Sequence, residues 1–424
     1  MLISIVIPTR ERAEVLRHAL ASCTRIIDPD LEIVVSDNAS QDDTSAVVAA
    51  NADSRIRYLR TPRRCSMREN FEFAVSNARG DYVIIIGDDD GLIPNQFAYL
   101  RAVLAERRPD SFVGSVVTYD WPGDSAPATN GRLKLLYKST YGGLSEMSGA
   151  QLRAELRRVG AGVVADTARI YGGVVSRGVI EKMKARSGQL FMASSPDIYF
   201  MFAAPAMIER HVVMHHPFFI SGTSARSNGA SYHQWLRGDG PADEFKKYVE
   251  EVNSDPVLDP LPSTPSLQAC LLSQLEAANV HAYGGSLQVD YEREFERTIQ
   301  SLGNVDERLR AHELSALARL ATERGLPARL QDESLLAARC APRPKQRRNR
   351  RRAAVRGYVA ADRVVFDVIG RGPTDIDAAA AHCERLLGVR HPETGLGRLA
   401  AWAGLVRRAV AAPAQTSPAV RRRA

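Results

Sequence analysis

Short apolar runs and amphipathic stretches alternate along the first 120 residues of the chain. The apolar runs are rich in β-branched residues, and the stretches between them repeat their apolar positions every three or four residues. This alternation predicts an α/β fold in which a mostly parallel sheet carries helices on its faces. We expect strands over residues 2–7, 31–36, 56–59, 82–86 and 112–119, and helices over 13–22, 44–50, 67–78 and 95–106.

A second segment continues the pattern after these residues. Residues 121–147 are rich in Gly, Pro, Ser and Tyr, which predicts irregular structure or a hairpin. Helical periodicity then returns, and Pro196 after Ser195 indicates the start of a further helix. Residues 1–120 and 121–238 are therefore predicted to be two halves of one domain. In the second half we expect strands over 170–175 and 210–220, and helices beginning at 148, 177 and 197.

The last part of the chain has a different composition. Charged helical segments follow, and they are interrupted by the proline-rich stretch 255–265. We expect a helical region over 239–342, a basic linker over 343–355, and a helical segment over 356–424 that ends in a disordered tail. The candidate helices are 268–278, 291–302, 306–324, 332–339, 375–387 and 396–411.

The composition limits the class of protein. The chain has 424 residues, of which 45% are hydrophobic and 25% charged, as in ordinary globular proteins. The sequence has no apolar run close to the roughly 18 residues that cross a bilayer, and its first residues lack a basic region before the apolar part. The five cysteines are scattered without a CxxC pair. A disulfide framework or zinc site is therefore not expected, and the predicted location is the cytoplasm.

The net charge of +7 is concentrated in one segment. Residues 343–352 contain seven basic side chains and no acidic one, which equals the whole excess. A solvated linker explains such a run, and peripheral contact with anionic lipid at the inner membrane face is the alternative. Nucleic-acid binding is disfavoured because no aromatic residues are interleaved with the basic ones. The sequence leaves open whether the chain forms an oligomer.

Three adjacent aspartates follow the most apolar of the predicted strands. The segment reads GDYVIIIGDDDGLIP over residues 80–94, and its carboxylates belong to Asp88, Asp89 and Asp90. Ligands of open α/β sheets bind beyond the carboxyl ends of such strands. Hard oxygen ligands there suit Mg²⁺ or Mn²⁺ carrying a phosphorylated substrate. The alternative is a solvated acidic turn, because Asp-Gly pairs commonly form turns.

Three segments in this order carry a resemblance to a known family. SIVIPTRER, VSDNASQDDT and GDYVIIIGDDDGLIP resemble the nucleotide-sugar-binding half of family 2 glycosyltransferases, which have the GT-A fold, a Rossmann-related sheet. The similarity is strongest over residues 2–106 and extends to about residue 235. The resemblance implies a metal-dependent, inverting transfer of a sugar from a nucleoside-diphosphate sugar to an acceptor hydroxyl. It places the donor on residues 1–120 and the acceptor on 121–238.

The resemblance also implies roles for residues of the first half. Asp37 would accept a hydrogen bond from the imide N–H of the base, and Pro8 and Thr9 would contact the same base. Arg68 and Asn70 would face the nucleotide. Each has a simpler alternative: Asp37 as an Asx-turn residue, the Pro-Thr pair as a strand-ending turn, and the arginine as a solvated side chain.

The aspartate triplet resembles the D-x-D motif of this family. The resemblance gives Asp88 to the ribose hydroxyls, and Asp89 and Asp90 to a Mn²⁺ or Mg²⁺ ion that neutralises the departing diphosphate. Many relatives read D-x-D-D, whereas this chain has Gly87 at the first aspartate of that pattern. The division of roles among the three carboxylates is therefore left open.

An inverting transfer needs a base for the acceptor hydroxyl. Asp197, in the segment SSPDIYFMFA, resembles the acidic residue of the family's acceptor half, and Asp166 and Glu209 are the alternatives. An aspartate in the first turn of a helix also stabilises the helix dipole without any catalytic role. The loop 221–233 contains Arg226 among small residues, which suits a lid over a diphosphate or a plain surface loop.

Two other functions compete with sugar transfer. A nucleotidyltransferase also uses a parallel sheet and acidic metal ligands, but it normally has a glycine-rich loop after the first strand, and PTRERAE has no glycine. A non-catalytic nucleotide-binding or scaffold protein of the same fold is the second alternative. The sequence does not identify the sugar, the base or the acceptor.

Overall fold

The computed structural model describes most of the chain. The described residues are 1–122, 131–162, 166–227, 250–261, 266–304, 307–340, 358–360, 362–366, 373–388 and 395–411. The basic run 343–352, the end of the loop 221–233 and the tail 413–424 therefore lie outside the described residues.

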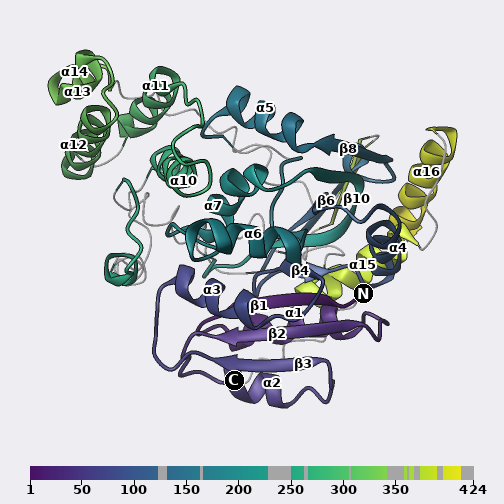
Figure 1. The fold of residues 1–424 in the computed structure, drawn as a ribbon. Coiled ribbons are helices and arrows are strands. Elements are labelled where there is room, and N and C mark those ends of the chain that lie inside the picture. Colours follow the sequence, from purple (N-terminus) through teal and green to yellow (C-terminus); the bar gives the residue numbers. More distant parts are fainter. Residues whose placement is uncertain are drawn as a thin grey trace, which may run out of the picture.

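Parallel strands form the sheet in the first half of the chain (Figure 1). β1 pairs in parallel with β2 on one side and β4 on the other, and β2 pairs in parallel with β3. Their carboxyl ends therefore lie at one edge of the sheet. β1, β2 and β4 are buried along their whole length, which explains their β-branched composition. The bounds are β1 Ile3–Thr9, β2 Leu31–Asp37, β3 Ile56–Arg60 and β4 Tyr82–Ile85.

Helices cover both faces of these strands. Val6, Val34 and Phe71 belong to a core cluster on the α3 face, whereas Ile5, Leu16 and Phe97 belong to a second cluster on the face of α1 and α4. α3 begins with a capping box. The Ser66 side chain accepts a hydrogen bond from the backbone N–H of Glu69, and the Glu69 carboxylate accepts one from the backbone N–H of Ser66. The bounds are α1 Ala13–Thr24, α2 Thr44–Ala49, α3 Met67–Asn77, η1 Pro94–Gln96 and α4 Phe97–Arg107.

The second half extends the same sheet with mixed strand directions. β9 lies between β4 and β6 and is antiparallel to both, while the long strand β10 runs parallel to β6 and antiparallel to β5 and β8. The bounds are β5 Gly91–Leu92, β6 Ser111–Asp120, β7 Arg132–Leu136, η2 Tyr137–Ser139, β8 Leu144–Ser148, α5 Gly149–Val159, β9 Gly173–Ser176, α6 Arg177–Ser187, α7 Pro196–Ala203, η3 Ala204–Ala206 and β10 Arg210–Thr223. β10 thus pairs with three strands, and it brings Gly222 and Thr223 at its end close to the residues that follow β4.

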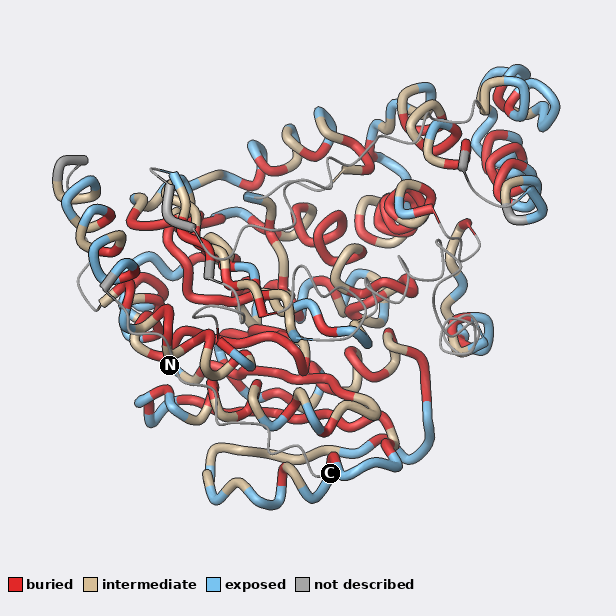
Figure 2. Tube along the Cα trace, turned by 180° about the vertical axis from the view of Figure 1, so that it is seen from behind, coloured by how far each residue is buried: buried red, intermediate tan, exposed pale blue. Residues whose placement is uncertain are grey.

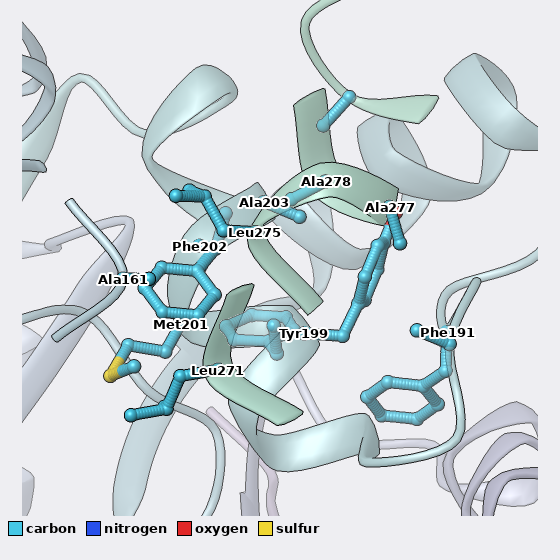
Figure 3. Packing of buried hydrophobic residues seen from close by; sticks show 14 of the residues in the cluster. Ala161, Phe191, Tyr199, Met201, Phe202, Ala203, Leu271, Leu275, Ala277 and Ala278 are labelled. Atoms are coloured by element: carbon cyan, nitrogen blue, oxygen red, sulfur yellow. The ribbon is translucent and has the colours of Figure 1, made fainter. Parts of the chain in front are cut away.

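A helical layer follows and packs on α7 rather than forming a separate body. Figure 3 shows Leu271 and Leu275 of α10 beside Met201 and Phe202 of α7. The remaining helices lie further from the sheet (Figure 1). The bounds are α10 Leu267–His281, α11 Tyr291–Ser301, η4 Leu302–Asn304, α12 Glu307–Glu323, α13 Ala328–Gln331 and α14 Glu333–Ala338.

The final segment returns to the first half of the chain. β12, Arg363–Phe366, pairs with β7 and with β11, Tyr358–Ala360, and adds two strands to the sheet. α15, Ile376–Leu387, packs against α1 and η1, and α16, Gly395–Ala411, packs on α15. The expectation of a purely helical segment over 356–424 therefore missed β11 and β12.

The α/β class, the mostly parallel sheet of the first half and the helical region after it are confirmed. The twelve described strands form one sheet, and Figure 2 shows that its central strands are buried on both faces. The strand expected over 82–86 ends at Ile85, and the one expected over 170–175 begins only at Gly173. Among the described helices, none combines the length and the apolar character that crossing a membrane requires.

Candidate active site

The carboxyl edge of β1, β2 and β4 brings the predicted donor-site segments together. Thr9 pairs with Asp37 in the register of β1 and β2. The Thr9 hydroxyl donates a hydrogen bond of 2.8 Å to Oδ2 of Asp88, just beyond β4. The turn after β2 and the aspartate triplet therefore lie at one edge, joined by the last residue of β1.

Asp88 is buried and pairs with an arginine that the sequence analysis did not single out. Nη1 of Arg12 lies 2.8 Å from Oδ1 of Asp88, and the carboxylate side chain is only 4% exposed. Burial raises the pKa of Asp88, against the opposing effects of Arg12 and Thr9. Arg12 precedes α1, and its only sequence signal was its place in the turn after the first strand.

Asp89 and Asp90 are held by the end of β10 and the residues after it. The Ser224 hydroxyl donates to Oδ2 of Asp89 at 2.6 Å, and the backbone N–H of Gly222 donates to Oδ1 of Asp90 at 2.7 Å. Burial, with the charge of Asp89 added, raises the pKa of Asp90 to about 7. Gly222 and Ser224, in the first part of the loop 221–233, therefore contact the triplet, and the role of this loop as a lid stays a prediction.

Oxygen atoms converge on the space beside Gly87. A Cβ placed on this glycine would lie 3.1 Å from Oδ1 of Asp89, 3.1 Å from Oδ2 of Asp90 and 2.4 Å from the hydroxyl oxygen of Tyr171. No group of three or more His, Cys, Asp or Glu side chains among the described residues is arranged to hold a metal ion. Magnesium on a nucleotide needs only one or two carboxylates, because phosphates and water supply the rest. The pair Asp89 and Asp90 fits such an ion.

Asp37 is fully buried and already has several partners. Its Oδ1 accepts from the Ser40 N–H, which is the Asx-turn contact, and its Oδ2 accepts from the Tyr58 hydroxyl at 2.5 Å and from Nη1 of Arg60 at 2.8 Å. The contact with a base therefore stays a prediction. Tyr58 and Arg60 on β3 are new members of this site.

Pro8, Arg68 and Asn70 lie in the frame of the site. Pro8 is buried in β1 opposite Ser36. The Asn70 side chain exchanges hydrogen bonds with Ser36, which ties α3 to β2. Nε of Arg68 lies 2.8 Å from Oδ2 of Asp255, and both side chains are 3% exposed. Each of these residues thus has a structural partner, and their contact with a nucleotide stays a prediction.

Further arginines lie around the same edge. Arg10 and Arg64 both pair with Glu251, with Nε of Arg64 2.5 Å from the carboxylate. The backbone oxygen of Arg226 accepts a hydrogen bond from the Arg12 side chain. The Arg226 side chain donates to the carbonyl of Glu11 at 3.3 Å. Each of these arginines is therefore bonded to a carboxylate or a backbone oxygen at this edge.

Asp197 is the second residue of α7 and is half-buried. Burial raises its pKa, and its charge contributes to the raised pKa of Tyr171, whose hydroxyl lies next to the triplet. Asp197 lies in the first turn of α7, in the second half of the domain. Glu209 lies just before the first residue of β10, whereas Gly222, near the last residue of β10, bonds to Asp90. The length of this strand therefore separates Glu209 from the triplet. Asp166 is exposed.

Two solved structures match most of this chain at low sequence identity. Residues 1–349 of TarS from S. aureus are 12% identical, with a TM-score of 0.44 over 85% of this chain and 94% of that one. The mannosyltransferase PcManGT from Pyrobaculum calidifontis, solved with GDP-Man and Mn²⁺, is 15% identical, with a TM-score of 0.36 over 80% and 85%.

Sequence relatives cover a shorter part of the chain. Abequosyltransferase RfbV of Salmonella typhimurium is 38% identical over 109 residues, which are 24% of this chain and 33% of that protein. The GalNAc(5)-diNAcBac-PP-undecaprenol beta-1,3-glucosyltransferase of Campylobacter jejuni is 34% identical over 101 residues, 23% and 33% of the two chains. The chain thus matches about a third of the length of these relatives. The family model described as Glycosyl transferase family 2 matches residues 4–152 of this chain, the segment that runs from β1 past β4 and the aspartate triplet.

Proposed function

We propose that the chain is a glycosyltransferase that moves a sugar from a nucleoside-diphosphate sugar to an acceptor hydroxyl. The observation that carries this proposal is the carboxyl edge at which Thr9, Asp37 and the triplet meet, within the segment that the model of glycosyl transferase family 2 matches. Strand ends of an open sheet are where nucleotides bind in such folds.

The donor binds along this edge. Asp37 and Thr9 face the base, Asp88 faces the ribose, and Arg12 and Arg226 offer positive charge to the diphosphate. Arginine suits this task because its planar guanidinium donates several hydrogen bonds to phosphate oxygens. On donor binding, Arg12 exchanges part of its contact with Asp88 for phosphate.

Asp89 and Asp90 would hold a Mn²⁺ or Mg²⁺ ion. When bound, the ion supplies Lewis-acid stabilisation of the charge on the departing diphosphate. Ser224 and Gly222 keep these carboxylates in place through their hydrogen bonds, so the end of β10 orients the ion-binding oxygens.

Asp197 accepts the proton of the acceptor hydroxyl. Burial raises the pKa of Asp197, and a carboxylate with a raised pKa is a stronger base once it is ionised. Attack from the side opposite the diphosphate inverts the anomeric configuration. Residues 121–238 hold the acceptor in this scheme, and the two curated relatives above are named for sugar transfer, one of them to an undecaprenol-linked acceptor.

Binding is the first test, because it does not require the acceptor. Purified protein is screened by thermal shift with UDP, TDP and GDP, each with and without Mn²⁺, and we expect one diphosphate to stabilise it in a Mn²⁺-dependent manner. The matching nucleotide sugars are then incubated with the protein, and the products are separated. Release of nucleoside diphosphate supports sugar transfer, and release of pyrophosphate supports a nucleotidyltransferase. No binding of any diphosphate contradicts the proposal and supports a scaffold role.

A further inference from the structure

The glycine that departs from the family pattern has a structural cause. A Cβ at Gly87 would lie 2.4 Å from the hydroxyl oxygen of Tyr171, a distance that real Cβ atoms do not adopt. No side chain therefore fits at position 87 while the Tyr171 hydroxyl stays where it is. The space that an aspartate side chain would fill is occupied by an oxygen from a different segment of the chain.

The backbone around Tyr171 fixes this arrangement. The Ile85 N–H donates to the carbonyl of Ile170 at 2.9 Å, and the Gly172 N–H donates to the carbonyl of Ile85 at 2.8 Å. These two bonds attach the tyrosine's segment to the end of β4, immediately before the triplet. Gly172 has φ +63°, and any Cβ on it would collide with the ring of Phe219. The turn after Tyr171 is thus restricted to glycine.

The ring and hydroxyl of Tyr171 are also held in place. Its ring packs edge-on against that of Phe219, with centroids 6.3 Å apart. Its hydroxyl forms a hydrogen bond with the carboxylate of Asp90. Oδ1 of Asp89 and Oδ2 of Asp90 approach the same space beside Gly87. The phenol oxygen therefore joins the two carboxylates that fit a divalent cation.

We propose that Tyr171 is a positioning residue of the donor site, and that its hydroxyl takes over the place of the carboxylate missing at Gly87. It orients the Asp90 carboxylate toward the cation and the diphosphate. Tyr171 is supplied by the second half of the domain, so it connects that half to the carboxylates after β4. This inference depends on the proposed function, since it assigns a role within the same site.

A purely structural role for Tyr171 makes a different prediction. A buried tyrosine hydroxyl usually needs a hydrogen-bond partner, and Asp90 would satisfy that need without any ligand. In that case, removal of the hydroxyl changes the melting temperature but not the affinity for the ligand. Partners in the outer shell of a metal site, in contrast, change affinity by about 10- to 100-fold when they are removed.

The first experiment is Tyr171→Phe in the full chain. The probe is the diphosphate that stabilises the wild-type protein most in the panel of UDP, TDP and GDP with Mn²⁺, and its affinity is measured by calorimetry with and without the ion. We expect the Mn²⁺-dependent affinity to fall by about tenfold and the affinity without the ion to stay within about twofold. Tyr82→Phe is the matched control, because the Tyr82 hydroxyl is bonded to the Pro109 carbonyl at the other end of β4.

The second experiment is a double-mutant cycle with Gly87→Ala. The added methyl group displaces the Tyr171 hydroxyl, so Gly87→Ala alone should weaken Mn²⁺-dependent binding at least as much as Tyr171→Phe. Once the hydroxyl is gone, the methyl group meets less resistance. Gly87→Ala combined with Tyr171→Phe should therefore bind no worse than Gly87→Ala alone, which is a non-additive result. Gly143→Ala is the control, because nothing lies within 4 Å of its added Cβ.

The outcomes separate this inference from the proposed function. If the wild-type protein binds the diphosphate and Tyr171→Phe binds it within about twofold as tightly, the role of Tyr171 is overturned. The glycosyltransferase proposal then remains intact. If the two substitutions reduce the Mn²⁺-dependent affinity additively in the cycle, the claim that the Tyr171 hydroxyl occupies the space beside Gly87 is overturned. If the wild-type protein binds no diphosphate at all, the proposed function falls and this inference falls with it.

Discussion

Arg68 on α3 and Asp255 form a buried ion pair, with Nε of the guanidinium 2.9 and 2.8 Å from the two carboxylate oxygens. The same carboxylate accepts from the Ser66 hydroxyl, which caps α3. Gln189 and Phe191 accept from Nη1 of Arg68. The pair therefore connects the donor-site helix to the segment before α10.

This pair predicts a loss of stability when the arginine is removed. In Arg68→Ala the Asp255 carboxylate stays buried without its counter-ion, so we expect the free energy of unfolding to fall by about 3–5 kcal/mol. Urea denaturation measures this change. Arg63→Ala on the neighbouring turn is the control, because the Arg63 side chain is 68% exposed and its pair with Glu69 contributes less than about 1 kcal/mol. Unchanged stability in Arg68→Ala, together with weaker nucleotide binding, would instead support the role that the family resemblance implies for Arg68.

Asp89→Asn tests the ion-binding carboxylate. The amide keeps the size of the side chain and can still bond to Ser224, but it lacks the charge that attracts a divalent cation. We expect the Mn²⁺-dependent part of diphosphate binding to fall by about 10- to 100-fold, with little change in the melting temperature. Asp43→Asn is the control, because Asp43 is exposed and its side chain makes no cap hydrogen bond with α2. Equal Mn²⁺-dependent binding by Asp89→Asn and the wild-type protein would remove Asp89 from the cation site.

Asp197→Asn separates donor binding from transfer. The side chain begins α7 on the acceptor side, so its replacement should leave the affinity for the diphosphate unchanged. Turnover of the nucleotide sugar with an acceptor should fall by about 10²- to 10⁴-fold, as for the loss of a general base. Glu209→Gln is the control, because a full strand separates Glu209 from the triplet. Transfer that persists in Asp197→Asn would exclude Asp197 as the base.

The sequence predicted the parts of the site that depend on neighbouring residues. The strand ends at Thr9, Asp37 and Asp88 could be placed at one edge because parallel strands share their direction. An apolar run followed by polar residues is a local pattern, and so is the capping box that begins α3. The same reasoning placed Asp197 correctly in the first turn of a helix.

The parts that depend on distant contacts were not predicted. Glu251 lies 187 positions beyond Arg64, and Asp255 lies 187 positions beyond Arg68, so no local signal links these pairs. Tyr171 had no motif of its own, although Gly87 indicated that something was unusual at that point. The strand β12 was missed because its pairing partner, β7, lies more than 200 residues earlier.

Histidine side chains of β10 take part in packing. Nε2 of His216 is bonded to Oε1 of Gln96, and its Nδ1 accepts from the N–H of Tyr141, each at 3.0 Å. Both ring nitrogens are therefore used in packing β10 against η1 and the residues after η2. His211 at the start of β10 is fully buried as well.

His211 predicts how stability depends on pH. Its Nδ1 lies 2.7 Å from the Ser111 hydroxyl and its Nε2 lies 3.0 Å from the Asp166 carbonyl, and burial lowers its pKa to about 4. In the unfolded chain a histidine titrates near its ordinary value of about 6.5. Between these two values the unfolded chain binds a proton that the folded chain does not, so stability falls as the pH falls from about 6.5 to about 4.

The size of this effect follows from the shift. A shift of the His211 pKa from about 6.5 to about 4 corresponds to about 3 kcal/mol in the free energy of unfolding. The protein has this stability in full above the pKa of the unfolded chain and has lost it below the pKa of the folded chain. Urea denaturation of the wild-type protein and His211→Asn at pH 7, 6 and 5 measures it. Because the carboxylates titrate alike in both proteins, their contribution cancels in the difference. We expect the wild-type protein's advantage in the free energy of unfolding to shrink as the pH falls. A constant difference across this range would show that His211 does not carry the dependence.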